Sequence, residues 1–403
     1  MKFYKLNQNN DLKMGKRILL IEICDFNNYP IGGYLSFAKQ MLTAFGNQLV
    51  LVGICTDDSP IGKWIKKEID GIEYDYFAVA KIQKTNTKTF IPYRLKSYLA
   101  VRKYRKEILC IGIENVFIQT PEVLFALKDQ KMKNLCCRIP GVGNPMTYSR
   151  YWYGKFFSKI FDYYFFKELK KSNVILASAD KFAIQGFIER EKGKLLIDNV
   201  IQFPTRINTD IFKPTDKVKE RLDLNLENYD KIIVTTGRLS ELKGWKFMID
   251  CFVKYKSIYP NSIFIFLGDG EDRNKIETYI EKELIKDNVI ISGRVTHEEL
   301  SKYLNAADLY IMGSYIEGWA TSLVEAVSCA KPVVCTHFSS ANELIEYGVN
   351  GYVIEEHNLN DFVDAMLRCE TIEKQNLILK SNQMQQYAVS NLKDSIFKHW
   401  ELN

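Results

Sequence analysis

Short apolar runs alternate along this chain with stretches whose apolar residues recur at helical spacing. The first run is KRILLIEIC (16–24), and a loop and the helix-like SFAKQMLTAF follow it. Similar runs follow at NQLVLVGIC, GIEYDYFAV, ENVFIQT and NVILAS, and a second series extends from 231 to about 385. Such alternation predicts parallel sheets joined by crossover helices. The stretch 203–215, with two prolines among polar residues, is typical of a linker between two such arrays.

Two glutamates, Glu317 and Glu325, bracket seven residues in which the pattern changes from a turn to a helix. AADLYIM (306–312) predicts a short buried strand, and the SLVEAV segment has the apolar spacing of a helix. The inner face of this helix is expected to carry Leu323, Val324 and Val327. Thr321 and Ser322 therefore open a helix directly after a strand, and their amides are first-turn donors without intrahelical acceptors. At the carboxyl end of a parallel sheet, such donors bind phosphate.

This arrangement can hold a nucleotide sugar. The amides would contact the phosphates, one carboxylate would accept ribose hydroxyls, and the other would accept hydroxyls of the sugar. Gly318, directly after Glu317, belongs to the same turn and to the same predicted donor site. The spacing E-x7-E is a loose pattern, and the alternative is that both glutamates are solvated surface charges.

A second element upstream favours the binding site. In KIIVTTGRLSELKGWKFMIDCF (231–252), a β-branched strand leads into Gly237 and Arg238, and Lys243 comes directly before a helical run. Both cations are thus expected at the carboxyl end of another strand. Departure of a nucleoside diphosphate builds negative charge on its bridging oxygen, which two cations at this place can stabilise.

The C-terminal half resembles the retaining glycosyltransferases of family 4, which have the two-domain GT-B fold. The resemblance rests on five pieces in the family's order: GRLSELKG (237–244), LGDGED (267–272), ISGRVTHEELSKYLNAADLYI (291–311), EGWATSLVEAVSCAKPVV (317–334) and ANELIEYGVNGYVI (341–354). It implies an α/β fold with two Rossmann-like parallel-sheet domains facing a deep cleft.

The resemblance also implies roles for single residues. The counterpart of Glu317 contacts the donor sugar, and that of Glu325 contacts the ribose. The counterparts of Arg238 and Lys243 hold the diphosphate, so that Glu317, Arg238 and Lys243 form the expected catalytic set. The residues implied at the base and at the phosphates are Gly293, Arg294 and Val295, and Thr321 and Ser322.

The expected domains are residues 1–205, which bind the acceptor, residues 206–385, which bind the nucleotide sugar, and a helix within 386–403 that crosses back to the first domain. Gly32 and Gly33 follow the first strand and resemble the family's glycine-rich loop, where the backbone passes close to the diphosphate. A second loop, RIPGVGNPMTYSR (138–150), is expected to reach the acceptor or to form a structural turn. Its candidate acceptor-site residues are Arg138, Gly141 and Asn144.

The four histidines of the chain, His297, His337, His357 and His399, all lie in the second half, although many family members place one in the first domain. A retaining transfer tolerates this absence, because the departing phosphate oxygen can take the acceptor proton. An inverting transfer would need a carboxylate such as Asp25 or Glu122 as base. No metal or other cofactor is expected besides the nucleotide sugar, because LGDGED lacks the closely spaced carboxylates of a manganese site.

Composition favours a cytoplasmic protein. No apolar run approaches the roughly 18 residues that span a bilayer, and the first residues do not resemble a cleavable leader. Nine cysteines without paired CxxC spacing fit a reducing compartment and argue against a zinc site.

Charge is distributed unequally. Residues 1–200 hold 32 Lys and Arg against 19 Asp and Glu, a net of +13, whereas the remainder holds 23 against 30, a net of −7. In 146–171, lysines interleave with a dense run of aromatic residues. Phe156, Phe157 and Ile160 recur at helical spacing and are expected in the core. Trp152, Tyr153, Lys155 and Lys159 resemble an amphipathic patch that rests on an anionic membrane; core packing alone is the alternative, and no nucleic-acid-binding motif accompanies the charge.

We therefore predict a peripheral membrane glycosyltransferase that moves a sugar from a nucleoside diphosphate to a glycan acceptor with retention. The expected acceptor is a lipid-linked glycan of a bacterial surface polysaccharide, such as capsule, O-antigen or exopolysaccharide. Two alternatives remain open: an enzyme of the same fold on a soluble substrate, such as an epimerase or a disaccharide synthase, and a non-catalytic partner subunit.

Overall fold

The computed structural model describes residues 17–30, 32–82, 93–147, 152–190 and 199–400. The chain divides into two compact domains. Residues 1–205 and 389–403 form the first domain, and residues 206–388 form the second. The chain therefore leaves the first domain after Thr205 and re-enters it at Val389, close to the limits expected from the sequence.

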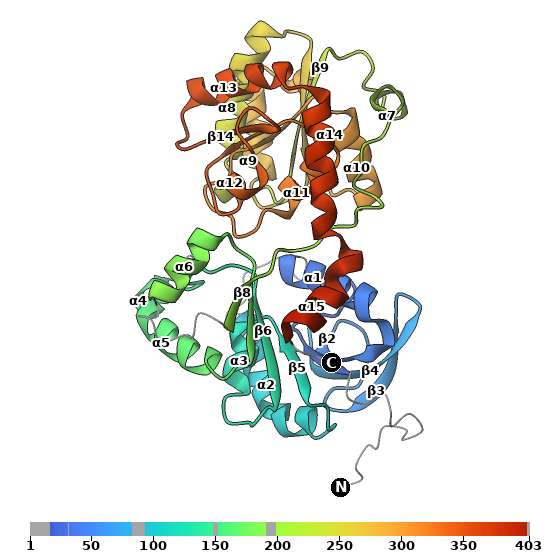
Figure 1. Ribbon diagram of the computed structural model, residues 1–403, viewed down its shortest axis with the longest axis vertical. Helices are drawn as coiled ribbons and strands as arrows, with labels where there is room; N and C mark the ends of the chain where they lie inside the picture. Colours follow the sequence, from blue (N-terminus) through green and yellow to red (C-terminus); the bar gives the residue numbers. More distant parts are fainter. Residues whose placement is uncertain (1–16, 31, 83–92, 148–151, 191–198, 401–403) are drawn as a thin grey trace. The chain divides into compact units, whose positions relative to one another are not determined.

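The first domain is built on an eight-stranded sheet with helices on both faces (Figure 1). Its strand order is β3-β4-β2-β1-β5-β6-β7-β8, and all pairs are parallel except β3 with β4. The strands are β1 (Ile18–Ile21), β2 (Leu49–Cys55), β3 (Trp64–Ile69), β4 (Ile72–Lys81), β5 (Asn115–Ile118), β6 (Asn134–Ile139), β7 (Val174–Ala177) and β8 (Val200–Gln202). The helices are α1 (Gly33–Phe45), α2 (Tyr93–Leu109), α3 (Pro121–Ala126), α4 (Trp152–Phe156), α5 (Ser158–Leu169), α6 (Lys181–Arg190) and α15 (Leu392–Trp400).

The second domain has a six-stranded, fully parallel sheet in the order β11-β10-β9-β12-β13-β14. Its strands are β9 (Lys231–Thr236), β10 (Ser262–Leu267), β11 (Val289–Gly293), β12 (Leu309–Met312), β13 (Val333–Thr336) and β14 (Gly351–Ile354). The helices are α7 (Lys217–Asp223), α8 (Trp245–Ile258), α9 (Arg273–Lys282), α10 (His297–Ala306), α11 (Thr321–Ser328), α12 (Ala341–Leu344), α13 (Leu359–Arg368) and α14 (Lys374–Gln383). This is the common order of a dinucleotide-binding sheet, three strands on each side of the point where chain order reverses.

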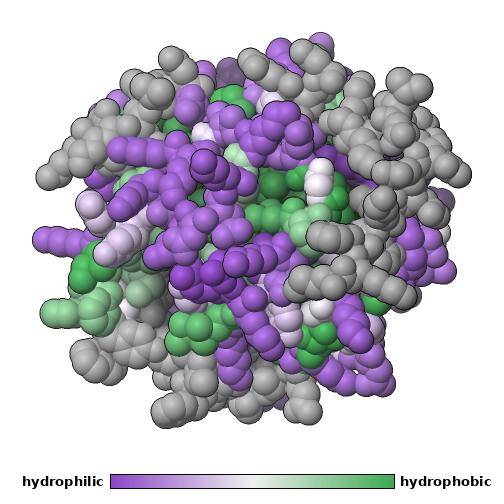
Figure 2. Space-filling view, turned by 90° about the horizontal axis from the view of Figure 1, so that it is seen from below, coloured by the Kyte–Doolittle hydropathy of each residue, from purple (hydrophilic) through white to green (hydrophobic). Residues whose placement is uncertain are grey.

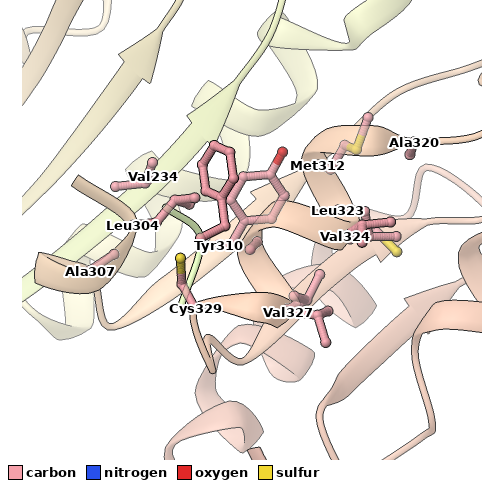
Figure 3. Close-up of a cluster of buried hydrophobic side chains, with 14 of the residues drawn as sticks. Val234, Leu304, Ala307, Tyr310, Met312, Ala320, Leu323, Val324, Val327 and Cys329 are labelled. Atoms are coloured by element: carbon pink, nitrogen blue, oxygen red, sulfur yellow. The ribbon is translucent and has the colours of Figure 1, made fainter. Parts of the chain in front are cut away.

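The core of the second domain fixes the start of α11. Figure 3 shows Tyr310 of β12 between Val234 of β9 and Met312 of β12, with side chains of α10 and α11 around them. The predicted inner face of α11 is confirmed, because all three of its residues are buried: Leu323, Val324 and Val327. Burial of three aliphatic side chains contributes roughly 1.5 to 3 kcal/mol each, so the helix is firmly held on the sheet.

The prediction for the aromatic segment was wrong in one respect. Phe156, Phe157 and Ile160 are exposed by 77%, 44% and 52%. Phe157 separates α4 from α5, and Phe156 and Ile160 lie on the same exposed helical face as Tyr163 and Tyr164. The buried residues of α5 are Phe165, Phe166, Glu168 and Leu169. The side chains of Trp152 and Tyr153 lie outside the described part of the structure.

The hairpin of β3 and β4 was not predicted as two strands. Its turn uses Asp70 and Gly71, both with positive φ, which suits the tight turn of a hairpin. Among the described residues, no helix is both long and apolar enough to cross a bilayer.

Candidate functional site

The candidate site lies where β9 and β12 run side by side in the second domain. They are paired at Ile233 with Leu309 and at Val234 with Tyr310. The chain continues outward from β9 to β10 on one side and from β12 to β13 on the other, so their carboxyl ends flank the switch point of the sheet. Ligands of open α/β sheets bind in the crevice at this point.

Lys243 and Glu317 form an ion pair across this switch point. Lys243 ends the single 3-10 turn Glu241–Lys243 that follows β9, and Glu317 lies in the loop that follows β12. Lys243 Nζ lies 2.5 Å from Glu317 Oε1, and both side chains are partly buried. Two residues that are 74 positions apart in the sequence thus meet at one point.

Glycines allow these two loops to touch. Gly244 adopts the left-handed conformation with φ 66°, and a Cβ there would lie 1.8 Å from the carbonyl oxygen of Gly313. No L side chain fits at that distance. A backbone hydrogen bond of 2.9 Å from Tyr315 N to Leu242 O joins the same loops. The loop bearing Lys243 and the loop bearing Glu317 are therefore held together by backbone contact.

Helix α11 directs its first turn toward the same end of the sheet. Its first-turn amides include those of Thr321 and Ser322, which have no intrahelical acceptor. The preceding amide, Ala320 N, donates instead to Ser340 Oγ at 3.2 Å. Ser340 has φ 76° and was missed by sequence reasoning, because nothing in the printed order of residues marks a serine that supports a distant helix start.

Glu325 lies one turn further along α11. It is 9% exposed, and burial raises its pKa to about 8. A carboxyl group in such surroundings is protonated near neutral pH unless a ligand compensates its charge.

Arg238 is exposed and pairs with Glu271 through Nε at 2.8 Å. It lines one small pocket together with Lys243, and the other lining residues include Thr236, Gly237, Trp245 and Ser314. The two cations predicted from the sequence therefore share a pocket, but only Lys243 contacts a predicted carboxylate.

The residues expected near the base lie at the end of β11. Gly293 ends the strand with φ 76°, Arg294 is exposed, and Val295 packs against the core of the domain. Arg273 Nη2 donates to Ile291 O at 3.3 Å beside them. These residues are separated from β9 by β10, so they form the outer part of the same sheet edge.

The glycine loop of the first domain lies at the start of α1. Gly32 and Gly33 are exposed, and no described atom would come within 4 Å of a Cβ at either position. The carbonyl of Gly32 accepts from Ser36 N at 3.0 Å and begins the helix. The open space around both glycines is compatible with close approach of a ligand.

Arg138 and Asn144 are buried. Arg138 donates to Gln119 Oε1 at 2.9 Å and to Ser178 Oγ and Thr205 Oγ1 at 2.8 Å, and its guanidinium lies over the ring of Phe37. These bonds tie adjacent strand ends together.

Asn144 donates from Nδ2 to Ser158 O and accepts from Met146 N, so it shapes its own loop. Gly141 is partly exposed. Acceptor contact by the three residues of this loop stays a prediction.

Of the two carboxylates considered as bases, Asp25 is fully engaged. Its Oδ1 accepts from the amides of Asn27, Asn28 and Tyr29, and its Oδ2 accepts from Thr56. Glu122 pairs with Arg94 at 3.2 Å.

Glu22, which sequence reasoning missed, follows β1 and is 1% exposed, and burial raises its pKa to about 8. Its position inside an apolar run gave no signal.

Residues 216–388 match the family Glycosyl transferases group 1. An uncharacterized glycosyltransferase of Methanocaldococcus jannaschii is 25% identical over 314 residues, which cover 75% of this chain and 71% of that protein. The alpha-monoglucosyldiacylglycerol synthase of Acholeplasma laidlawii is 25% identical over 37% of this chain and 38% of that protein.

Solved structures resemble both domains. Sucrose-phosphate synthase from Thermosynechococcus elongatus has a TM-score of 0.74 at 16% identity and covers 95% of this chain and 98% of its own. The Anabaena protein HepE, solved in complex with UDP-glucose, has a TM-score of 0.70 at 16% identity and covers 96% of this chain and 99% of its own. These likenesses confirm the predicted fold class of two Rossmann-like domains, the GT-B fold. The chain is a GT-B protein whose residues 216–388 are similar to Glycosyl transferases group 1.

Proposed function

We propose that this chain transfers a glycosyl group from a nucleoside diphosphate sugar to a glycan acceptor, with retention at the anomeric carbon and in the manner of glycosyltransferase family 4. The observation that carries the proposal is the Lys243–Glu317 pair at the switch point of the second sheet. It places a cation for phosphate beside a carboxylate for sugar hydroxyls, at the end of the sheet where α/β proteins bind ligands.

Binding of the donor exchanges the partners of this pair. The diphosphate offers Lys243 two negative charges in place of one, and Glu317 is then free to accept hydrogen bonds from the hydroxyls of a hexosyl group. Arg238 can leave Glu271, because both side chains are exposed and a surface ion pair contributes little, about 0 to 1 kcal/mol. The first-turn amides of Thr321 and Ser322 add donors to the phosphates.

Glu325 takes the ribose in this proposal, and the backbone of residues 293–295 takes the base. Hydrogen bonds from the two ribose hydroxyls to Glu325 would replace those from the water that burial has removed. The free-energy cost of the ionised carboxylate is therefore lower in the complex than in the free protein. The HepE structure supports a nucleotide sugar as the ligand of this fold.

The reaction we propose needs no protein base. The bond from the anomeric carbon to the diphosphate oxygen breaks, and the acceptor oxygen forms its bond to the same face of that carbon. The acceptor proton passes to the departing phosphate oxygen. Lys243 and Arg238 stabilise the negative charge on the diphosphate, as a bound metal ion does in other enzymes. We propose the nucleotide sugar as the sole co-substrate.

The acceptor side of the proposal rests on an exposed surface that we call the α4–α5 face. Its aromatic and aliphatic residues are Phe156, Phe157, Ile160, Tyr163 and Tyr164, exposed by 44% to 77%, and its exposed lysines are Lys155, Lys159 and Lys167. On the left side of Figure 2, the side on which Figure 1 draws α4 and α5, hydrophobic side chains lie among hydrophilic ones.

Exposed rings flanked by lysines suit an anionic lipid surface. We propose that this face holds the protein at the inner surface of a bacterial membrane. There it would meet a lipid-linked glycan of a surface polysaccharide. The similarity to a glycolipid synthase supports this choice.

Thermal unfolding in the presence of UDP, GDP, ADP, dTDP and CMP tests the donor site. A ligand at about 100 times its dissociation constant adds roughly 2.7 kcal/mol to the stability of the folded state. We expect one diphosphate to raise the midpoint of the wild type, with the effect lost in Glu325→Ala and kept in the control Glu373→Ala, which changes an exposed glutamate of the same domain.

Turnover of the corresponding nucleotide sugar, with the anomer of the product read by NMR, then tests transfer and retention. Stabilisation by no diphosphate would remove the catalytic proposal and favour the partner subunit.

A further inference from the structure

We propose that His357 is a positioning residue for Glu317. The inference rests on the proposed function of Glu317 and identifies what holds that carboxylate in place. His357 lies in the loop between β14 and α13, 40 positions after Glu317 in the sequence, and neither its neighbours in the sequence nor its spacing mark it as part of the site.

A hydrogen bond and a ring contact join His357 to the loop that bears Glu317. Its Nε2 lies 3.0 Å from the carbonyl oxygen of Gly313, the first residue of that loop. A carbonyl oxygen only accepts, so Nε2 carries the hydrogen and donates it. The imidazole also stacks on the ring of Tyr315, with centroids 4.0 Å apart and planes 13° from parallel. One side chain thus holds the loop at two points, two residues apart and directly before Glu317.

His357 is itself fixed from the other side. The ring of Phe247 on α8 packs edge-on against it at 4.9 Å, and Phe362 on α13 packs on Phe247 at 5.1 Å. Asn358, the next residue, caps α13 by accepting from the amides of Asn360 and Asp361. Because a capped helix and a buried ring set its position, the imidazole can set the position of the loop that it contacts.

The same contacts extend to Lys243. The Gly313 carbonyl that accepts from His357 is the group against which Gly244 packs without a Cβ, and the Tyr315 amide donates to Leu242. His357, the 313–317 loop and the 241–244 turn therefore form one continuous set of contacts around the Lys243–Glu317 pair. A loss at His357 releases the 313–317 loop on one side, so that the backbone hydrogen bond from Tyr315 to the turn opens more often.

Three variants separate the hydrogen bond from the ring contact. His357→Ala removes both, His357→Phe keeps a ring against Tyr315 without a donor, and His357→Gln keeps a donor amide without the ring. Tyr347→Ala is the control, since it removes another ring of the second domain, 66% exposed, which packs edge-on against Tyr352. Each variant is compared with the wild type in kcat, in the Kd of the nucleoside diphosphate and in hydrogen exchange of the Tyr315 amide.

We expect His357→Ala to lower kcat about 10-fold, because small displacements of a contacting group are costly in the transition state. The Kd of the diphosphate should change less than about twofold, since Lys243 and the α11 amides bind it, as in the proposed function. Exchange of the Tyr315 amide should become about 10-fold faster. His357→Gln should recover part of both losses, and Tyr347→Ala should match the wild type.

The proposal is overturned if His357→Ala and His357→Phe both keep the wild-type kcat and the wild-type exchange rate of Tyr315. It is also overturned if kcat and diphosphate affinity fall by the same factor, because that result would mean that the substitution disrupts the whole site and not the position of Glu317 alone. If the wild type turns over no nucleotide sugar, the proposed function fails, and the exchange of the Tyr315 amide still decides whether His357 holds the loop.

Discussion

At the scale of single residues, Lys243 and Glu317 restrain each other before any ligand arrives. Each neutralises the other at the switch point, which keeps two partly buried charges from lying there unpaired. A change to one partner therefore alters what the other can bind.

We expect Glu317→Gln to lower kcat/KM about 100-fold, since a neutral amide is a weaker acceptor for hydroxyls of the sugar in the transition state. The same substitution should leave diphosphate affinity equal to or better than that of the wild type, because the carboxylate no longer competes with the diphosphate for Lys243. Steady-state kinetics and titration calorimetry with the diphosphate check the two halves. Weaker diphosphate binding, equal in size to the loss of kcat/KM, would contradict the proposed exchange of partners.

Glu22 gives a prediction that concerns stability alone. Its pKa is raised from 4.5 to about 8 by burial, so the folded state holds a proton that the unfolded state has released at intermediate pH. The stability that this proton supports is complete below about pH 4.5 and declines as the pH rises toward 8.

Glu22→Gln should therefore match the wild type in urea unfolding at about pH 4 and exceed it by roughly 1 to 3 kcal/mol at pH 8. Glu68→Gln, at an exposed glutamate of the same domain, serves as a control that should not gain stability with rising pH. A Glu22→Gln variant that is less stable than the wild type at pH 8 would contradict the burial argument.

The meeting of Lys243 and Glu317 at one sheet edge was predictable because local pattern places both residues. Lys243 and Glu317 each follow a recognisable strand and precede a recognisable helix start, so their arrival at one sheet edge follows from parallel topology. His357, Ser340 and Glu22 could not be found in this way. Their importance comes from contacts between distant loops or from burial, and neither leaves a periodic trace in the sequence.

At the scale of secondary structure elements, the helical spacing of the aromatic segment was correct and the choice of its inner face was wrong. Phe156, Ile160, Tyr163 and Tyr164 share one helical face, and this face is exposed. Phe165, Phe166 and Leu169 lie on the opposite face and are buried. Both faces carry large apolar residues, so periodicity alone does not indicate which of them faces the core.

The α4–α5 face should bind vesicles through these exposed residues. We expect the double variant Phe156→Ser with Ile160→Ser to lose most of its co-sedimentation with vesicles that contain anionic lipid, because insertion of the rings and neutralisation by the lysines act together. Leu284→Ser, at an 89% exposed residue of the second domain, is the control and should bind like the wild type. Equal binding by the double variant and the control would remove the membrane part of the proposal.

At the scale of the whole molecule, the first domain is completed by the last described helix of the chain. Leu392 and Ile396 of α15 belong to its core, and Trp400 packs on Phe117 with ring centroids 6.1 Å apart. The indole also donates to Asn134 Oδ1 at 2.7 Å. The second domain is contiguous in sequence, and α15 belongs to the first.

Trp400→Ala should therefore destabilise the first domain by about 3 to 5 kcal/mol and leave the second unchanged. Unfolding of the chain is expected to show two transitions, and only the second domain's transition should shift when the diphosphate is added. Differential scanning calorimetry with and without the ligand distinguishes them. A single transition that moves as a whole in the variant would show that the domains unfold together.

The return of the chain at Val389 also imposes an order on synthesis. When residue 205 has been made, the first sheet is complete, yet the helix that covers part of its core does not exist. At about 5 to 20 residues per second, the ribosome needs roughly 10 to 40 s to make residues 206–403. During that interval the second domain can fold, while the first exposes the surface that Leu392, Ile396 and Trp400 later cover. The domain that is synthesised first is thus the last to be completed. Until α15 has been made, its exposed core residues would need protection by chaperones.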